Sequence, residues 1–361
     1  MKKNNDESKL ISSEQAVHAP TSRDVALLAG VSQSSVCRVF DSKWSDRISP
    51  KLRQKVLSAA AELGYSPNAI ARSLTVNRSG IVGVIVSEDF NEFYYDLLRR
   101  ITNELQKQDM RVMVFNAAPY RDIGQVFQKL AEYRVDGVIV TAAAISSMAE
   151  PFKLDRDVPM VLVNIYSSEP FCDTVITDNY AGSMKAASYL YDCGHRDFVF
   201  VSAENSLYYD VPDRKRGFMD FIAQKSDATC THIAGNYSYR SGQAVGRRIF
   251  SEGKKPDCIF CSGTRMAFGV MDVARYEFGY SIPDELSVAA YDDLNTTYLD
   301  SYNLTGVQQN SDELAKVAVS LLQKAINGER SDQVEIVQVP TRLEIRGSVR
   351  CAAETAEQIS Q

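Results

Sequence analysis

The sequence predicts a small all-α domain followed by a two-lobed α/β domain with parallel sheets. Three observations lead to this fold class. Short helical patterns lie before residue 66, and from residue 80 apolar runs of strand length alternate with helical patterns. The second part also holds roughly 270 residues, which is large for one sheet. Strands that are apolar throughout and joined by helices are typical of a parallel sheet covered on both faces.

The composition is that of a globular protein, with 361 residues, 45% hydrophobic and 24% charged. No run approaches the roughly 18–20 apolar residues that cross a bilayer. Residues 1–20 are polar and lack the apolar core of a secretory signal. We therefore expect a flexible tail there, a cytoplasmic protein and no membrane partner. The seven cysteines are odd in number and scattered, which fits a reducing compartment and not a disulfide framework.

Charge is unevenly spread along the chain, whose net charge is −6. Residues 1–80 hold 12 Lys and Arg against 7 Asp and Glu, a net of +5. The remainder holds 28 against 39, a net of −11. A basic head on an acidic body indicates an anionic partner at the N-terminal end only.

Three helices are predicted in the head. Asp24–Gly30 reads as a short helix that ends at its glycine, and Ser32 can cap a second helix over Gln33–Phe40. Ser49 followed by a proline begins a third, which runs to about Leu63. Five apolar side chains have the spacing of a small shared core: Val25, Leu28, Val31, Val36 and Val39.

Helix, tight turn and helix form a helix-turn-helix pattern. The outer face of its second helix carries Gln33, Ser34, Cys37 and Arg38. Polar residues at a helix N-terminus suit base edges in the major groove, and Arg38 could pair with guanine or phosphate. The alternative is a helical bundle without a role on DNA, and the basic charge of the head favours the DNA interpretation.

The body is expected to alternate strands and helices. The predicted strands include Ile81–Val86, Arg111–Asn116, Gly137–Thr141, Met160–Asn164, Phe198–Ser202, Cys258–Ser262 and Ser287–Tyr291. The predicted helices include Tyr94–Gln108, Ile123–Tyr133, Tyr180–Cys193 and Ser241–Glu252. A short helical pattern, Asn68–Leu74, lies in the linker that precedes the body.

Several motifs occur together at recognisable spacings. The head has Asp24-Val-Ala-Leu-Leu-Ala-Gly-Val-Ser32, and the linker has Leu63-Gly-Tyr-Ser-Pro-Asn-Ala-Ile-Ala-Arg-Ser-Leu74. The body has Ile81-Val-Gly-Val-Ile-Val86, Asp136-Gly-Val-Ile139, Gly194-His-Arg196 and Tyr291-Asp-Asp293. In these motifs the chain resembles the LacI/GalR family of bacterial transcription regulators, over roughly residues 21–350.

The resemblance implies a division of the chain. A flexible tail (1–20) precedes a helix-turn-helix DNA-binding domain (21–65), a linker with a hinge helix (66–79), an effector-binding and dimerisation domain (80–350) and a tail (351–361). The body would have the periplasmic-binding-protein fold. Its N-lobe would hold about residues 80–178 and 305–336, and its C-lobe about 179–304 and 337–350. The chain would cross between lobes near Asp178, Thr305 and Val337.

The resemblance also implies which residues meet DNA. Gln33 and Ser34 fall where the family reads bases, and the hinge helix enters the minor groove, where Leu74 would wedge into a base step. The implied DNA contacts are Ser22, Ser32, Gln33, Ser34, Ser35, Cys37, Arg38, Asn68, Ala71, Arg72 and Leu74. Ser35, Cys37 and Asp41 replace the usual Thr, Ser and Asn. Because a thiol is a weak donor, simple packing is the alternative for Cys37.

An effector is expected between the lobes, at the carboxyl ends of strands. The implied effector-binding residues are Phe93, Tyr94, Asn164, Arg214, Gly263, Arg265 and Asp292. An Arg and an Asp that face each other beside aromatic rings suit the hydroxyls of a sugar or sugar derivative. The alternatives without a role in binding are a surface ion pair for Arg214, a structural cap for Asp292 and core packing for Phe93 and Tyr94.

One departure from the family concerns the effector. Gly263-Thr264 stands where many members have an Asn-Asp pair, and Arg265 follows. If Arg265 points inward, an anionic effector such as a sugar acid or a sugar phosphate becomes a second hypothesis.

No pattern supports an enzyme, a cofactor or a metal. Cys258 and Cys261 would need two further ligands for zinc, and they lie in an apolar strand-like run. Asp292 and Asp293 are adjacent on a predicted strand, so their side chains would point to opposite faces. A phosphate-binding loop and a dinucleotide fingerprint are both absent from the sequence.

The function predicted is that of an allosteric transcription regulator, which we expect to be a repressor. It would bind a palindromic operator in double-stranded DNA as a homodimer, through contacts of Tyr94–Gln108 and Met266–Phe278. A small-molecule effector would control its affinity for the operator. The alternative is a small-molecule binding protein without operator function.

Overall fold

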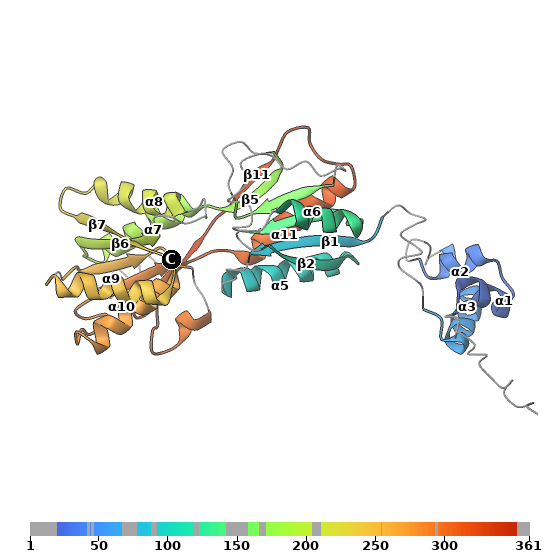
Figure 1. Ribbon diagram of the computed structural model, residues 1–361, viewed down its shortest axis with the longest axis horizontal. Coiled ribbons are helices and arrows are strands. Elements are labelled where there is room, and N and C mark those ends of the chain that lie inside the picture. The colour runs from blue at the N-terminus through green and yellow to red at the C-terminus, as the bar shows by residue number, and fades with distance from the viewer. Residues whose placement is uncertain are drawn as a thin grey trace, which may run out of the picture. The chain divides into compact units, whose positions relative to one another are not determined.

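The computed structural model describes residues 20–41, 44, 47–66, 78–87, 92–117, 123–141, 158–165, 171–203, 211–253, 255–292 and 295–351. The chain divides into two compact units, Met1–Ser79 and Gly80–Gln361 (Figure 1). They are called the head and the body below.

The head contains the three predicted helices, α1 (Ser22–Ala29), α2 (Gln33–Val39) and α3 (Pro50–Leu63). Thr21 caps α1 in a reciprocal arrangement with Asp24, and Ser49 caps α3 ahead of its first-position proline. α1 and α3 both end at a glycine in the left-handed conformation. The predicted boundaries of the helix-turn-helix are therefore confirmed to within one or two residues.

The core of the head differs in one respect from the predicted one. Val25, Val36 and Val39 are buried as expected, but Leu28 is 46% exposed and Val31 only partly buried. α1 instead turns toward α3 a face made of Val25, Ala26 and Ala29. At roughly 100° per residue, Leu28 lies about 100° away from the centre of that face. The prediction that Leu28 lies in the core was wrong. Leu28 is three residues after Val25, and this spacing fits either of two neighbouring faces of α1.

The body contains two six-stranded sheets. In the first sheet the order is β11 (Ile336–Val339), β5 (Asp173–Thr177), β4 (Met160–Val163), β3 (Gly137–Thr141), β1 (Ile81–Ser87), β2 (Arg111–Ala117). In the second it is β12 (Arg342–Glu344), β10 (Thr305–Gln308), β9 (Ser287–Tyr291), β8 (Cys258–Cys261), β6 (Asp197–Ala203), β7 (Thr229–Gly235). Neighbouring strands are parallel, except that β10 and β12 are antiparallel. The parallel α/β class is confirmed.

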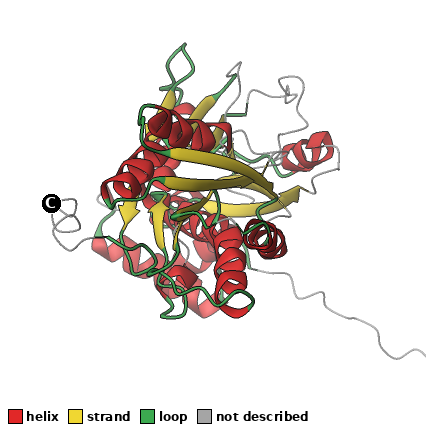
Figure 2. Ribbon diagram, turned by 90° about the vertical axis from the view of Figure 1, so that its left-hand side faces the viewer, coloured by secondary structure: helices red, strands yellow, loops and turns green. Residues whose placement is uncertain are grey.

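Helices cover both faces of each sheet (Figure 2). α5 (Glu92–Gln106) and α11 (Ser311–Ile326) share one apolar core with the first sheet, and α6 (Ile123–Glu132) contributes to the core on its other face. α9 (Tyr239–Ser251) and α10 (Thr264–Tyr276) cover one face of the second sheet. α7 (Asn179–Asp192) and α8 (Val211–Ala223) cover the other. A short 3₁₀ helix, η2 (Asn295–Tyr298), follows β9.

The chain passes from sheet to sheet at three points. The first lies between β5 and α7, at Asp178, as expected. The other two lie after β10 and after β11, because β10 pairs in the second sheet and β11 in the first. The expected crossings near Thr305 and Val337 thus lie a few residues later, since an apolar strand beside a crossing gives no sign of which sheet it joins. The Asp178 amide donates to the Val339 carbonyl over 2.9 Å, which joins two of the crossings.

Among the described residues, the helices are all too short or too polar to cross a bilayer.

Close packing of α9 against α10 gives a stability prediction. A Cβ on Gly269 would lie 2.2 Å from the Tyr239 carbonyl oxygen, and one on Gly242 would lie 2.1 Å from that of Met266. We expect Gly269→Ala to force the helices apart and lower the free energy of unfolding by about 1–3 kcal/mol, measured by urea unfolding followed by circular dichroism. Exposed Arg248→Ala on α9 is the control, with an expected change below about 0.5 kcal/mol. Equal stability of the two variants would contradict the packing argument.

Candidate DNA-binding and effector-binding sites

The exposed face of α2 carries the side chains that the sequence predicts to read DNA. Gln33, Ser34, Cys37 and Arg38 are all exposed, whereas Val36 and Val39 on the opposite side are buried. This separation lets the polar face reach an outside partner while the apolar face fixes α2 on the head.

Hydrogen bonds order the polar side chains at the start of α2. The Gln33 side-chain amide donates to the Ser22 hydroxyl over 2.9 Å, which ties α2 to α1. The Ser32 hydroxyl accepts from the Ser35 amide and lies 2.8 Å and 2.9 Å from the hydroxyls of Ser34 and Ser35. Five of the predicted DNA contacts therefore form one polar surface.

Trp44 is a part of this surface to which the sequence analysis gave no role. The Arg38 guanidinium lies 5.0 Å from the centre of the Trp44 ring, and that of Arg47 lies 5.6 Å from it. Cation–π contacts of this kind hold a cation in place without neutralising it. The ring therefore keeps two positive charges beside the exposed face of α2.

The other predicted DNA contacts, Asn68, Ala71, Arg72 and Leu74, lie outside the described residues.

Arg214 and Asp292 form the ion pair that the sequence analysis expected in the body. Their side chains are 4% and 12% exposed, so this is not a surface pair, and two nitrogens of Arg214 each lie 3.4 Å from an oxygen of Asp292. Arg214 also donates to the Asn179 side chain over 3.0 Å and to the Ser262 carbonyl over 2.9 Å. Its guanidinium lies 3.9 Å from the centre of the Tyr291 ring.

Gln309 connects this pair to the first sheet. Its amide nitrogen donates to Asp292, and its amide oxygen accepts from Asn164 over 2.8 Å and from the Thr177 hydroxyl over 2.7 Å. The Asn164 side-chain oxygen in turn accepts from the Thr177 backbone amide over 2.9 Å, and it lies 3.0 Å from the Thr177 hydroxyl, whose single hydrogen it shares with Gln309. Asn164, Thr177, Gln309, Asp292 and Arg214 are called the polar chain below, because they link the carboxyl ends of strands in both sheets.

Two members of the polar chain adopt an unusual backbone conformation. Asn164 has φ 55° and Asp292 has φ 69°, a region that residues other than glycine seldom occupy. Backbone strain of this kind is found most often at binding and catalytic sites.

The remaining predicted effector residues lie in different surroundings. Phe93 and Tyr94 are buried in the core formed by α5, α11 and the first sheet, with ring centres 5.1 Å apart. Gly263 caps α10, and a Cβ there would lie 2.7 Å from the Tyr237 ring. Arg265, in the first turn of α10, is exposed. The polar chain therefore unites only three of the seven predicted residues, namely Asn164, Arg214 and Asp292.

Gln309, Thr177, Asn179 and Tyr291 are residues of this site that the sequence analysis did not select. Tyr291 begins the quoted motif Tyr291-Asp-Asp293, and Asn179 directly follows the expected crossing at Asp178, so their positions offered a signal. Gln309 follows β10 and Thr177 ends β5. Neither has a signal in sequence alone, because their role depends on which strands meet at the crossings.

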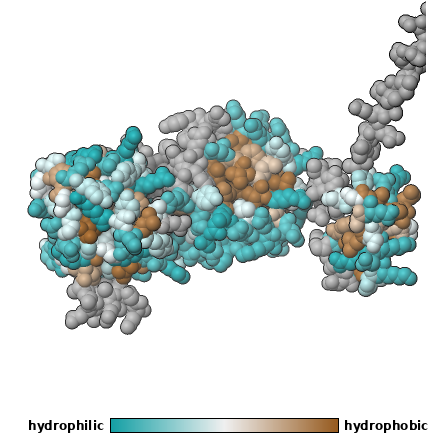
Figure 3. All heavy atoms as spheres, turned by 90° about the horizontal axis from the view of Figure 1, so that it is seen from below, coloured by the Kyte–Doolittle hydropathy of each residue, from teal (hydrophilic) through white to brown (hydrophobic). Residues whose placement is uncertain are grey.

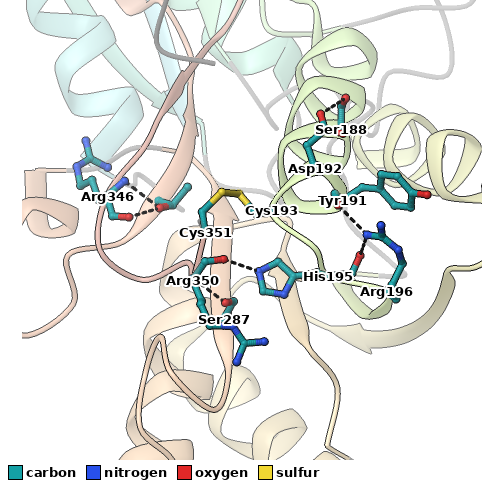
Figure 4. Close-up of a disulfide and its surroundings, with 11 residues drawn as sticks. Ser188, Tyr191, Asp192, Cys193, His195, Arg196, Ser287, Arg346, Arg350 and Cys351 are labelled. Atoms are coloured by element: carbon teal, nitrogen blue, oxygen red, sulfur yellow. Dashed lines mark hydrogen bonds between the residues drawn. A yellow bond between two sulfur atoms is a disulfide. The ribbon is translucent and has the colours of Figure 1, made fainter. Parts of the chain in front are cut away.

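The cysteines correct one expectation. Cys193 and Cys351 form a disulfide (Figure 4), although the odd, scattered cysteines had argued against disulfides. Spacing failed here because the two residues are 158 positions apart and only folding brings them together. Cys258 and Cys261 are fully buried in β8, where desolvation raises the pKa of both thiols. Among the described residues, no cluster of His, Cys, Asp or Glu could hold a metal ion.

Known proteins resemble the chain in both units. Residues 21–68 match the family model of bacterial regulatory proteins of the lacI family, and residues 187–349 match that of the periplasmic binding protein-like domain. The HTH-type transcriptional repressor PurR of Histophilus somni (strain 129Pt) is 29% identical over 334 residues, which cover 91% of this chain and 99% of that one.

Solved structures show the same fold. The lac repressor dimer bound to operator and the anti-inducer ONPF has a TM-score of 0.75 at 22% identity, and the match covers 91% of this chain and 98% of that one. A LacI family transcriptional regulator from Enterococcus faecium with bound ribose has a TM-score of 0.66 at 26% identity, covering 75% and 99%.

A matching head, a matching body and full-length relatives that regulate transcription agree with the exposed polar face of α2 and the polar chain. The chain belongs to the LacI family of bacterial transcription regulators, which are not enzymes, and it has a helix-turn-helix head and a periplasmic-binding-protein-like body.

Proposed function

We propose that this protein is a repressor that binds a palindromic operator as a homodimer and that a sugar-like effector controls its operator affinity. The observation that carries the proposal is the exposed, hydrogen-bonded polar face of α2 in a head that matches the lacI family. A repressor must reach chromosomal DNA, so we place this protein in the bacterial cytoplasm, and at the nucleoid when it is bound to its operator.

On DNA, Gln33 and Ser34 contact base edges and Arg38 contacts guanine or phosphate, with Trp44 positioning its guanidinium. The Asn68–Leu74 segment acts as the hinge helix, and Leu74 wedges into the minor groove. This assignment rests on the family resemblance.

Exposed apolar side chains support the dimer. In the view from below, apolar residues gather over the part of the body that holds β2 (Figure 3). Val114 on β2 and Tyr133 after α6 are 49% and 53% exposed, and Tyr95 on α5 is 65% exposed. In the lobe built on the second sheet, called the second lobe below, Tyr276 at the end of α10 is 80% exposed. Monomeric proteins rarely leave contiguous apolar surface in water, so a second copy of the chain is the natural cover.

The effector binds at the polar chain. Hydroxyl groups can both accept from Arg214 and Gln309 and donate to Asp292, and a sugar supplies several of them in a fixed arrangement. The ribose bound to the Enterococcus faecium regulator is in accord with this class of ligand. An anionic sugar derivative is the second hypothesis, and Arg265 at the start of α10 would be its cationic partner.

Selection of binding sites from random DNA tests the repressor function. The full chain is incubated with random duplexes at fixed salt, with and without pools of sugars and sugar acids. We expect recovery of a palindrome, because two identical heads read two half-sites, and a change in recovery with one pool. A folded dimer that selects no sequence in any pool would favour a small-molecule binding protein without operator function.

Arg38→Ala tests the recognition face directly. We expect operator affinity to fall by about 1–3 kcal/mol, because a groove contact is lost. Trp44→Leu keeps the charge but removes the ring that positions it, so it should weaken binding less. Fluorescence anisotropy with a labelled operator measures both variants, and thermal denaturation checks that the head remains folded. Unchanged operator affinity in Arg38→Ala would rule out its groove contact.

Asp292→Asn tests the effector site. We expect effector affinity to fall at least tenfold, or about 1.4 kcal/mol, because an amide cannot accept as strongly as a carboxylate. Calorimetric titration against the sugar that shifts operator binding provides the measurement. Arg265→Ala separates the two ligand classes, since it should weaken only an anionic effector. Full effector affinity in Asp292→Asn would place the ligand elsewhere.

A further inference from the structure

The disulfide between Cys193 and Cys351 joins the residue after α7 to a segment that follows β12. Cys193 directly follows the last residue of α7 and caps that helix. Cys351 is the last residue of a short segment after β12, residues 345–351, which is called the C-terminal segment below. The two Cα atoms are 4.5 Å apart, within the range that a disulfide requires.

Hydrogen bonds hold the C-terminal segment in place independently of the sulfur atoms (Figure 4). The Val288 amide donates to the Ser348 carbonyl over 3.0 Å, and the Thr305 amide donates to the Ser348 hydroxyl over 2.8 Å. The Arg350 amide donates to the Ser287 hydroxyl over 3.0 Å. Because these bonds do not involve the sulfur atoms, we expect them to keep Cys351 beside Cys193 when the disulfide is reduced.

A buried histidine strengthens this anchoring. The His195 ring nitrogen Nε2 lies 3.1 Å from the Arg350 carbonyl oxygen, and the residue is 1% exposed. Desolvation lowers the pKa of His195, so the ring is neutral near pH 7 and can donate to that carbonyl. Arg350, which is next to Cys351, is thereby fixed to His195, which lies two positions after Cys193.

Burial distinguishes this pair from most other thiols of the body. Cys193 and Cys351 are only partly buried and lie at the margin of the apolar core formed by α7, α8 and the second sheet. Cys172, Cys258 and Cys261 are buried, and burial raises the pKa of the Cys172 thiol to about 12. Burial likewise raises the pKa of Cys230 to about 12. Thiolates are the reactive form, so these four react poorly in exchange.

We propose that Cys193 and Cys351 are a reversible thiol–disulfide site that responds to the redox state of the cell. One thiolate attacks a disulfide RSSR of the low-molecular-weight class, which releases one RSH and leaves a mixed disulfide. The second thiolate attacks the protein sulfur of that mixed disulfide and releases the second RSH. Two protein thiols are oxidised, one RSSR is reduced to two RSH, and an excess of RSH reverses both steps.

Oxidation has a structural consequence for the second lobe. The bond closes a loop of 158 residues, which reduces the freedom of the unfolded chain. It also fixes the far end of α7, the helix that starts beside the crossing at Asp178 and whose Asn179 accepts from Arg214. The oxidised lobe is therefore more resistant to unfolding than the reduced one.

Equilibration of the full chain in glutathione buffers tests the site. Samples with ratios from fully reduced to fully oxidised glutathione are quenched with an alkylating reagent, and mass spectrometry of peptides counts free Cys193 and Cys351. We expect the pair to pass reversibly from free thiols to disulfide while circular dichroism shows a folded chain. The melting temperature of the oxidised protein should be higher by roughly 5–15 °C.

Substitutions assign that shift to the pair. Cys193→Ser and Cys351→Ser should each abolish the redox-dependent part of the melting temperature, whereas Cys230→Ser should retain it. Wild-type protein that is reduced and alkylated gives the same comparison if either substitution impairs folding. A pair that never oxidises in the folded protein would overturn the proposal. So would a pair that stays oxidised in reduced glutathione, because the bond would then be a permanent crosslink.

Discussion

The buried ion pair of Arg214 and Asp292 is the interaction on which the arrangement of the body depends. Placing two charges in a largely dry environment costs several kcal/mol per ion unless other polar groups replace the lost water. Here the replacements come from distant parts of the chain, because Asn179, Ser262 and Gln309 each contact one of the two charges. The pair is therefore favourable only when α7, β8 and the crossing after β10 are in place.

The polar chain also ties the two sheets at their crossings. Gln309 contacts Asp292 in the second sheet and Asn164 and Thr177 in the first. Arg214 and Gln309 together donate three hydrogen bonds to the Asp292 carboxylate, so the proposed ligand, if it donated several hydroxyls to this group, would take over the bond that Gln309 now makes. Under this proposal the ligand and Gln309 would compete for the same carboxylate. Such competition is a physical basis for an effector that favours one arrangement of the lobes over another.

Sequence patterns predicted the helix boundaries of the head and the buried strands of the body, because both depend on residues that are close together in the chain. The three helices of the head were placed by Ser49, by the glycines that end α1 and α3, and by Ser32 before α2. The seven predicted strands all exist, because buried parallel strands form continuous apolar runs. The other five strands, β5, β7, β10, β11 and β12, were not predicted. β7, β11 and β12 are edge strands that are exposed in part and carry mixed residues, and β5 and β10 are short strands of five and four residues that include polar side chains.

Features that depend on distant contacts were predicted less completely. The motifs identified Arg214 and Asp292, and the structure pairs them, but Gln309 stands 17 residues from Asp292 and 145 from Asn164. Phe93 and Tyr94 were chosen for their place after a strand, yet the structure packs them in the core of the first lobe. A pattern shows that a residue follows a strand and does not show which way its side chain turns.

The expectation that the cysteines form no disulfide was wrong for the same reason, because the pairing depends on a contact between distant residues. An odd number of scattered cysteines argues against a disulfide framework, but a single pair needs only two residues that the fold brings together. α7 carries Cys193 to the edge of the second lobe, and hydrogen bonds to β9 carry Cys351 there. α7 begins with Asn179, which accepts a hydrogen bond from Arg214, and Cys193 directly follows its last residue. The helix therefore connects the polar chain to the C-terminal segment. Folding thus makes neighbours of two residues that no local pattern relates.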